Sequence, residues 1–204
     1  MNLDTWLVYL LAAIGLSLSP GPNGLLALTH GALHGPRKTL FTILGGSVGF
    51  IAVVALSMFG IGALLQTSLL WLTVMKWVGG AYLVWLGIQV WRSPPTGVDL
   101  PADARARSGP SLFRQGLLSA VTNPKALLFF AAFLPQFIDP RDSFVVQLLI
   151  FGGTFVVVEV SYELLLAGMA QRIAPWLARH GRWFNRATGG TFIGVGALLT
   201  TASR

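Results

Sequence analysis

Cysteine and charge are what this sequence most clearly lacks. It contains no cysteine, which excludes disulfides, thiol redox chemistry and thiolate metal sites. Charged residues make up 10% of the chain, whereas a soluble globular domain usually carries about 25%. Hydrophobic residues account for 54%, and the mean hydropathy is +0.70. This combination indicates an integral membrane protein.

Residue groupings typical of enzymes and metal proteins are also missing. The three histidines, His30, His34 and His180, lie near expected loops and form no ligand cluster. No serine or tyrosine has a neighbouring histidine at membrane depth, and there is no phosphate loop or nucleic-acid motif. We therefore expect no cofactor, no metal and no nucleic-acid partner. The net charge of +7 is interpreted as cytoplasmic membrane flanks.

Long apolar runs dominate the chain, and each is near the ~20 residues that a helix needs to cross a bilayer. We place six spans at approximately 5–28, 40–64, 69–91, 115–136, 144–170 and 187–202. The expected fold is an all-α integral membrane protein with six transmembrane helices. Its organisation is a first three-helix repeat at 1–92, a cytoplasmic linker at 93–111 and a second three-helix repeat at 112–204, forming one membrane domain.

Short matches in the same order indicate that the two halves are repeats. Pro20 in the first half matches Pro124 in the second. The further matches are Gly45-Gly46-Ser47 with Gly152-Gly153-Thr154, and Lys76-Trp77-Val78-Gly79-Gly80-Ala81-Tyr82 with Arg186-Ala187-Thr188-Gly189-Gly190-Thr191-Phe192. Because each half has three spans, the second copy would insert in the opposite orientation, as in inverted-repeat transporters.

The distribution of lysine and arginine predicts the topology. One side of the membrane would hold Arg37, Lys38, Arg92, Arg105, Arg107, Arg114, Arg172, Arg179, Arg182 and Arg186. The other side would hold only Arg141 and Arg204, with Lys76 at its edge. The basic side should be cytoplasmic, so both termini face outward.

Two clusters of helix-breaking residues interrupt the apolar runs. Ser19-Pro20-Gly21-Pro22-Asn23 breaks the first span, and Asn123-Pro124-Lys125 breaks the fourth. An interior proline costs a helix ~3 kcal/mol or more. Broken backbone at membrane depth survives only where protein or a water-filled cavity surrounds it. The simpler interpretation is that these prolines only kink helices, but their paired placement favours a binding site.

The breaks supply helix starts as well as helix ends. Asn123 is a good N-cap, and Pro124 suits the first helical position. Two half-helix N-termini would meet near the midplane, each with free N–H groups and roughly half a positive charge. Lys125 lies beside one of them, which predicts an anion site. A cation in a first helical turn also needs a partner, which would be Glu159, Glu163 or an anionic ligand.

Glu159 and Glu163 are the acidic residues at membrane depth, one helical turn apart in the fifth span. A carboxylate there is costly and by default marks a functional site facing the bundle interior. Two carboxylates at this spacing repel each other when both are charged, which suits groups that bind and release a proton. The alternative is a structural polar network with Tyr162 or Lys125.

These motifs together resemble a known family. Ser-Pro-Gly-Pro-Asn at 19–23, Gly45-Gly46, Lys76 to Leu83, and Asn123-Pro124-Lys125 running into Phe133-Leu134-Pro135-Gln136-Phe137 resemble the lysine exporter/homoserine-threonine resistance (LysE/RhtB) family of bacterial amino-acid exporters. The resemblance covers nearly the whole chain. It implies an inner-membrane carrier that exports amino acids in exchange for protons; together with the charge distribution above, this puts both termini in the periplasm. The first break is more similar to the branch for neutral amino acids.

The residues singled out above receive their roles from the helix breaks and the buried carboxylates. Substrate binding would involve Ser19, Pro20, Gly21, Pro22, Asn23, Asn123, Pro124 and Lys125, and proton coupling Glu159 or Glu163. One alternative is a cation or metal-ion exporter that uses the two glutamates as oxygen ligands. A membrane-embedded enzyme would need a nucleophile and base, which we do not find. The expected partners are the amino acid, protons and the lipid bilayer, with a homodimer left open.

Overall fold

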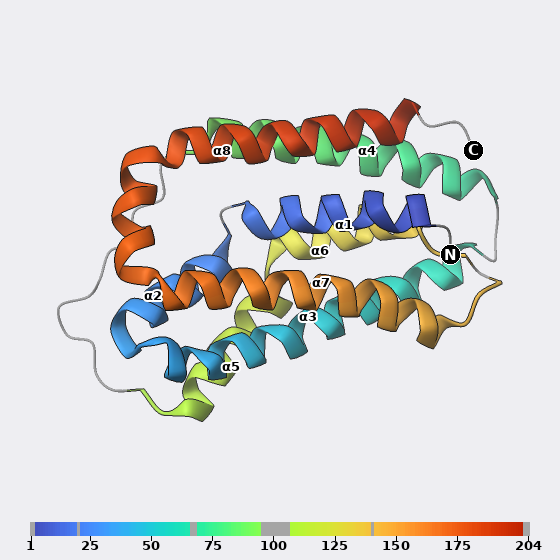
Figure 1. Cartoon of the computed structure of the whole chain (residues 1–204). Helices are drawn as coiled ribbons and strands as arrows, with labels where there is room; N and C mark the ends of the chain where they lie inside the picture. Colours follow the sequence, from blue (N-terminus) through green and yellow to red (C-terminus); the bar gives the residue numbers. More distant parts are fainter. Residues whose placement is uncertain (1–2, 20, 66–68, 95–106, 140, 202–204) are drawn as a thin grey trace.

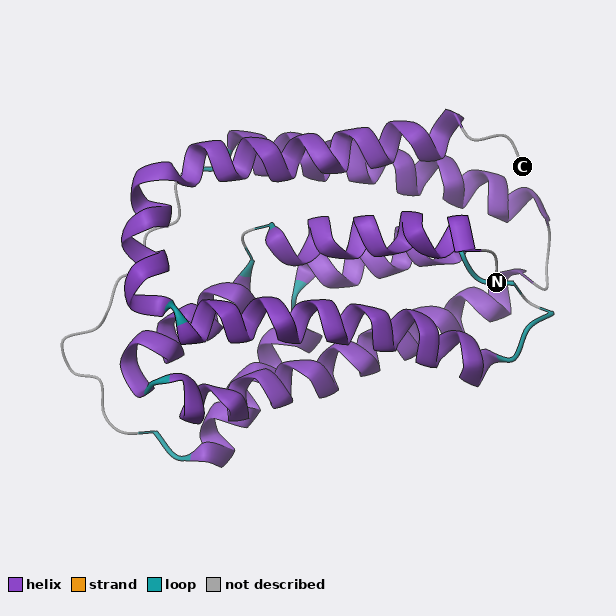
Figure 2. Cartoon of the chain, in the orientation of Figure 1, coloured by secondary structure: helices purple, strands orange, loops and turns teal. Residues whose placement is uncertain are grey.

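The computed structural model of this chain describes residues 3–19, 21–65, 69–94, 107–139 and 141–201, and these contain helices and loops but no strand (Figures 1 and 2). The predicted all-helical fold is therefore confirmed for the described residues. Pro20 and most of the predicted linker, 95–106, lie outside them.

The described helices follow the predicted spans closely, but two spans are divided. In chain order they are α1 (Leu3–Leu18), α2 (Pro22–His34), α3 (Pro36–Leu65), α4 (Leu69–Arg92), α5 (Gly109–Val121), α6 (Pro124–Phe133), the 3-10 turn η1 (Leu134–Gln136), α7 (Phe144–Gly168) and α8 (Ala170–Thr201).

The helices form an elongated bundle (Figure 1). The start of α1 and the end of α8 lie at one end of this bundle, and the turn between α2 and α3 lies at the other (Figure 1). α3 packs against α5, and α4 packs against α8. α7 contacts α1, α2 and α3, so it passes beside both halves of the broken first span.

Both predicted helix breaks are present. The axes of α1 and α2 are bent by 53° to each other, and those of α5 and α6 by 45°. Pro22 and Pro124 occupy first-turn positions, where the missing N–H costs nothing. Each proline therefore starts the second helix of its pair, and the residues between the helices are freed for other contacts.

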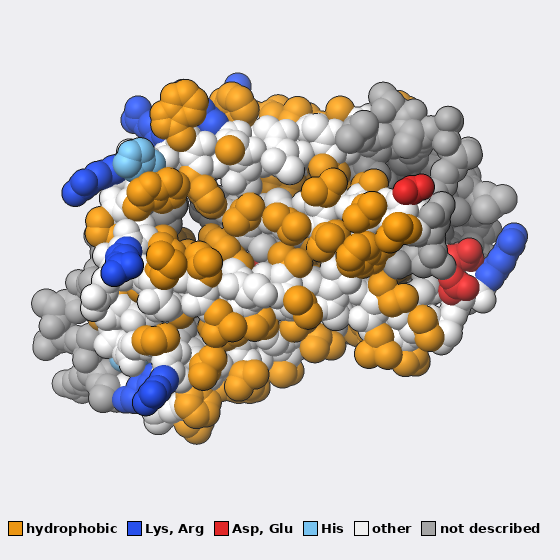
Figure 3. All heavy atoms as spheres, in the orientation of Figure 1, with side chains coloured by type: hydrophobic (Ala, Val, Ile, Leu, Met, Phe, Trp, Pro, Cys, Tyr) orange, Lys and Arg blue, Asp and Glu red, His pale blue; other side chains and the backbone are white. Residues whose placement is uncertain are grey.

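Length and composition identify helices that can cross a membrane. Within the described residues, α3 over Pro36–Gly60 and α7 meet this criterion singly, and each bent pair would add one more span. Over their described residues, α4 and α8 do not meet the criterion. Apolar side chains cover much of the flank in Figure 3, while Lys and Arg side chains gather mainly at one end. These features are consistent with a membrane protein.

Buried aromatic rings fill the bundle between the breaks and the end where α1 begins. Tyr9 on α1 donates a hydrogen bond from its hydroxyl to Phe151 O on α7, at 2.9 Å. Its ring stacks edge-on against Phe137 and Phe151. This aromatic cluster consists of Tyr9, Phe50, Phe129, Phe130, Phe133, Phe137, Phe151 and Phe155, all buried.

Glycines allow two helix pairs to touch backbone to backbone. A Cβ added to Gly116 of α5 would overlap Thr42 O of α3 and lie 3.0 Å from Gly46 N. A Cβ on Gly189 of α8 would lie 2.7 Å from Trp91 N of α4. Small residues serve this purpose in membrane proteins, where lipid is as apolar as the helix interface.

The last helix differs from its predicted extent. The expected span began at 187, but α8 is helical from Ala170. The hydropathy of 170–186 is lowered by four arginines, Arg172, Arg179, Arg182 and Arg186, which hides the helix from a search for apolar runs. α8 begins across the end of the bundle and then turns to run along α4 (Figure 1).

Candidate functional site

The two helix breaks meet in space. Gly21 is the N-cap of α2 in extended conformation, and Asn123 is the N-cap of α6. The Asn123 side chain accepts a hydrogen bond from Lys125 N at 3.1 Å, which confirms its predicted capping role. Asn123 Nδ2 also lies 3.5 Å from Asn23 Oδ1 in the first turn of α2. The starts of α2 and α6, which are distant in sequence, therefore form one polar junction.

Asn23 is the centre of this junction. Its Oδ1 accepts a hydrogen bond of 2.8 Å from Ser119 Oγ on α5 as well as the longer contact from Asn123. On its other side Asn23 lies within hydrogen-bonding reach of Glu163 on α7. A Cβ on Gly46 of α3 would sit 3.1 Å from Asn23 Nδ2 and 3.8 Å from Glu163 Oε2. The glycine at 46 thus leaves room for the polar groups.

Lys125 has a partner that sequence reasoning did not find. Its Nζ donates to Leu16 O at 2.8 Å, Ser19 O at 2.9 Å and Ser19 Oγ at 3.1 Å. An ammonium group has three donors, so all of them are used. Glu159 and Glu163, two of the predicted partners, interact with Lys125 through their charge, whereas its hydrogen bonds go to Leu16 and Ser19, whose carbonyls lie at the end of α1. These carbonyls carry the negative end of the helix dipole, which favours a cation there.

Glu159 and Glu163 lie on the buried face of α7, as their spacing predicted. Their exposed fractions are 5% and 2%. Glu159 lies beside Ser17 at the end of α1, and Glu163 beside Asn23 at the start of α2. Glu159 Oε2 and Ser17 Oγ make no hydrogen bond of good geometry in the described residues. Glu159 therefore faces the α1 side of the first break, and Glu163 faces the α2 side. Within the described residues, Glu159 Oε2 has no hydrogen-bond donor.

The junction brings together groups of opposite polarity. The first turns of α2 and α6 direct backbone N–H groups and positive dipole ends toward it. The two buried carboxylates of α7 approach the same residues from another side. Such an arrangement can hold a small molecule that carries both an anionic group and a cationic group. Lys125 contributes positive charge but no free hydrogen-bond donor.

A cavity of about 630 Å³ opens beyond the junction, between the α2–α3 turn and the α7–α8 turn. Its lining includes Gly31, Gly35 and Ala167, with Arg172 at its side. Ala167 follows Glu163 by one helical turn on α7. A Cβ on Gly31 would lie 2.6 Å from Ala167 Cα, so α2 and α7 touch without side chains between them. At this contact the cavity lies one helical turn of α7 from Glu163.

Several polar residues at the junction were not singled out from the sequence. Ser17 and Ser119 have no sequence feature that marks them out from other helical serines, and only the fold places them beside Glu159 and Asn23. His30 was expected near a loop, but it is buried within α2, and its Nδ1 lies 2.7 Å from Thr42 Oγ1 of α3.

The fold and this junction define a helical membrane protein whose polar groups gather where two helices are broken. The sequence matches the family model described as LysE type translocator over residues 14–203. The chain therefore belongs to the LysE type translocator family. No solved structure matches it.

Individual relatives support the same family assignment. The chain is 39% identical to the homoserine/homoserine lactone efflux protein of Salmonella typhimurium, over 99% of this chain and 98% of that protein. It is 30% identical to the leucine efflux protein of Klebsiella pneumoniae, over 96% and 94%. It is 36% identical to an uncharacterized membrane protein of Vibrio cholerae, over 99% of each. The resemblance to amino-acid exporters is confirmed, and the protein is a transporter and not an enzyme.

Proposed function

We propose that this protein is a secondary active exporter of neutral amino acids or close derivatives, driven by proton antiport across the bacterial inner membrane. The names of two relatives contain homoserine and leucine, which are neutral amino acids, and homoserine lactone, which is a close derivative. The proposed architecture has six spans in two inverted repeats, formed by α1/α2, α3 and α4, then α5/α6, α7 and the later part of α8. Both termini would face the periplasm.

One observation carries this proposal, namely that two half-helix N-termini and two buried carboxylates meet at the same junction. The carboxylate shared by amino acids would bind the free N–H groups at the starts of α2 and α6. The ammonium group would face Glu159 or Glu163. The substrate-binding residues in this proposal are Ser19, Pro20, Gly21, Pro22, Asn23, Asn123, Pro124 and Lys125, and Lys125 would act chiefly by its charge.

Proton coupling follows from the same two carboxylates. A glutamate that takes up a proton loses its attraction for the substrate ammonium, so protonation and substrate binding compete. Protons entering from the periplasm would release the amino acid there. Glu159 is favoured as the proton carrier, because Glu159 Oε2 lacks a hydrogen-bond donor in the described structure whereas Glu163 lies beside Asn23.

The cavity and the aromatic cluster support a transport path. The cavity at the basic end would admit the substrate from the cytoplasm. The buried rings between the junction and the opposite end would block the way to the periplasm. The described form would therefore be closed to the outside, and the contact of Gly31 with Ala167 would be the last barrier on the inside. Export would need the aromatic cluster to open after that contact closes behind the substrate.

Competition between an amino acid and its decarboxylated amine tests the proposed site. Proteoliposomes loaded with labelled leucine would be assayed for efflux with and without a pH gradient, in the presence of unlabelled leucine or 3-methylbutylamine. We expect leucine to inhibit and the amine to inhibit at least tenfold less. Homoserine lactone is a useful third competitor, because it keeps the carbonyl oxygen but has lost the negative charge. Equal inhibition by leucine and the amine would show that the carboxylate is not bound at the helix N-termini.

A further inference from the structure

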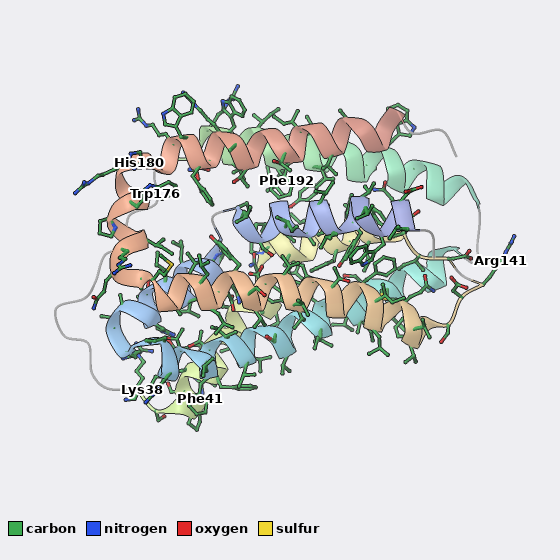
Figure 4. The ribbon with its side chains drawn as sticks, in the orientation of Figure 1. Lys38, Phe41, Arg141, Trp176, His180 and Phe192 are labelled. Carbon is green, nitrogen blue, oxygen red and sulfur yellow. The ribbon has the colours of Figure 1, made fainter. Side chains whose placement is uncertain are left out.

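The first part of α8 carries an alternating row of arginine and tryptophan. Arg172, Trp176, Arg179, Trp183 and Arg186 follow one another at steps of four, three, four and three residues. Within a straight helix this spacing places residues on one face. In α8 the row continues through the turn, because Trp176 lies on the part across the end of the bundle (Figure 4), whereas Asn185, between Trp183 and Arg186, already bonds to the residues that follow α4. All five are exposed, Trp176 at 49% and Trp183 at 71%. We call these five residues the Arg–Trp stripe.

The opposite face of the same segment is anchored to the bundle. Ile173 and Phe184 pack against a small buried cluster formed by Leu28 of α2, Leu166 of α7 and Ala170. The segment is therefore amphipathic, and its inner face is fixed while the Arg–Trp stripe remains outside. α8 starts across the end of the bundle, and Figure 4 shows Trp176 and His180 at that end, far from Arg141. This first part of α8 thus crosses the direction of the bundle, as an interfacial helix does.

In the part of the chain that the structure describes, no acidic side chain pairs with the arginines of the stripe. No aspartate or glutamate follows Glu163 in the sequence. Within the described residues, Arg172, Arg179 and Arg186 form no ion pair, and the aromatic contact of Arg186 is with Trp183, 5.5 Å from its ring centre. These exposed guanidinium groups are therefore available to an anionic partner from outside the protein.

The surroundings identify the partner as lipid. The neighbouring end of α7 exposes Leu164, Leu165 and Met169, at 41%, 54% and 44%. The stripe thus borders the apolar surface that faces the bilayer interior. Tryptophan favours the headgroup level, where its ring is apolar and its N–H is wet. Basic residues beside it bind anionic headgroups.

We propose that the Arg–Trp stripe is a binding site for anionic phospholipid headgroups, with the arginines on the phosphates and the tryptophans between the upper acyl chains. The site would hold the start of α8 in the plane of the membrane. This segment also lines the cavity through Arg172. The inference does not depend on which substrate is exported. An arginine row that serves only as a topology signal during insertion would show no preference for one lipid afterwards.

Purified full-length protein in a neutral detergent tests this site without a transport assay. The thermal unfolding midpoint is measured after adding phosphatidylglycerol, phosphatidylcholine or inorganic phosphate. We expect phosphatidylglycerol to raise the midpoint by several degrees and the other two to have little effect. Equal shifts with the two lipids would overturn the proposal, and an equal shift with free phosphate would assign the site to soluble anions.

A matched set of variants locates the effect. The triple variant R172Q/R179Q/R186Q should lose more than half of the shift with phosphatidylglycerol. The control variant R37Q/K38Q/R114Q removes the same charge from exposed residues of α3 and α5 and should keep the shift. The charge-preserving variant R172K/R179K/R186K should keep most of it. A full shift in the first variant, or an equal loss in the control, would place the effect outside the stripe.

Native mass spectrometry of the unaltered protein covers the case in which the triple variant does not fold. Protein equilibrated with equal amounts of the two lipids should retain phosphatidylglycerol in several-fold excess over phosphatidylcholine. Equal retention of both lipids would rule out the site without any substitution.

Discussion

Lys125 joins the two helix breaks through a single side chain. Replacing it by methionine would keep the apolar stem but remove all three hydrogen bonds to Leu16 and Ser19. An unpaired buried polar group costs about 1–3 kcal/mol. We therefore expect Lys125→Met to lower the free energy of unfolding by about that amount, measured by denaturant unfolding in detergent.

The exposed Lys38, at the end of the bundle, provides the matched control for this substitution (Figure 4). Lys38→Met should change stability by less than about 0.5 kcal/mol. If Lys125→Met weakens substrate affinity but leaves stability equal to that of the control, the ammonium binds substrate and does not cap α1.

The two buried glutamates provide the second test at the scale of residues. Glu159→Gln keeps the size and polarity of the side chain but cannot exchange a proton. We expect it to abolish efflux driven by a pH gradient while leaving exchange of substrate for substrate intact. Proteoliposomes loaded with labelled amino acid measure both. Normal pH-driven transport by both Glu159→Gln and Glu163→Gln would refute proton coupling at this site.

For single residues, the sequence predicts which side chains belong to the site better than it predicts which groups those side chains contact. The prolines, Asn123 and the glutamate pair could be recognised because each breaks a local rule for membrane helices. The partners of Lys125 could not, because backbone carbonyls have no sequence signature and lie 109 and 106 residues away. Ser17 and Ser119 escaped for a similar reason, since only the fold gives them polar neighbours.

Between elements, the packing of α5 on α3 depends on the absence of a side chain at Gly116. A methyl group there would overlap Thr42 O and crowd Gly46 N, both of which are backbone atoms that cannot rotate away. We expect Gly116→Ala to lower the unfolding free energy by about 1–3 kcal/mol. The comparison is Gly153→Ala on α7, where an added Cβ meets nothing within 4 Å. That substitution should leave stability unchanged or raise it by up to about 1 kcal/mol. Similar stabilities for the two variants would mean that α3 and α5 can separate at little cost.

Elements could be predicted where hydropathy alone defines them. α3 and α7 were predicted as long apolar runs, and each meets the membrane criterion by itself. The other two spans that meet it are the bent pairs α1/α2 and α5/α6, each divided by a helix break. The start of α8 was missed because its arginines lower the hydropathy of the segment. Its three-and-four spacing still favours a helix, but a search for apolar runs does not detect that spacing. The repeat relation between the halves stays a prediction, since it depends on short glycine motifs.

For the whole molecule, the uneven distribution of lysine and arginine gives a test of orientation. Figure 4 places Lys38 and Arg141 at opposite ends of the bundle. The absence of cysteine means that any introduced cysteine can be labelled without background. In intact cells, an impermeant maleimide should label Arg141→Cys, and it should label Lys38→Cys only after the membrane is permeabilised. Labelling in the reverse pattern would invert the proposed topology and put both termini in the cytoplasm.

The bond between Lys125 and α1 also has a consequence for biosynthesis. A ribosome completes Leu16 and Ser19 long before it reaches Lys125, because 109 and 106 residues separate them. During that interval α1 can enter the bilayer with carbonyls that no later helix has yet covered, and hydrocarbon cannot hydrogen-bond to them. The Lys125 ammonium group can bind these carbonyls only after α6 has been synthesised, so the two breaks cannot be joined before the second half of the chain is present.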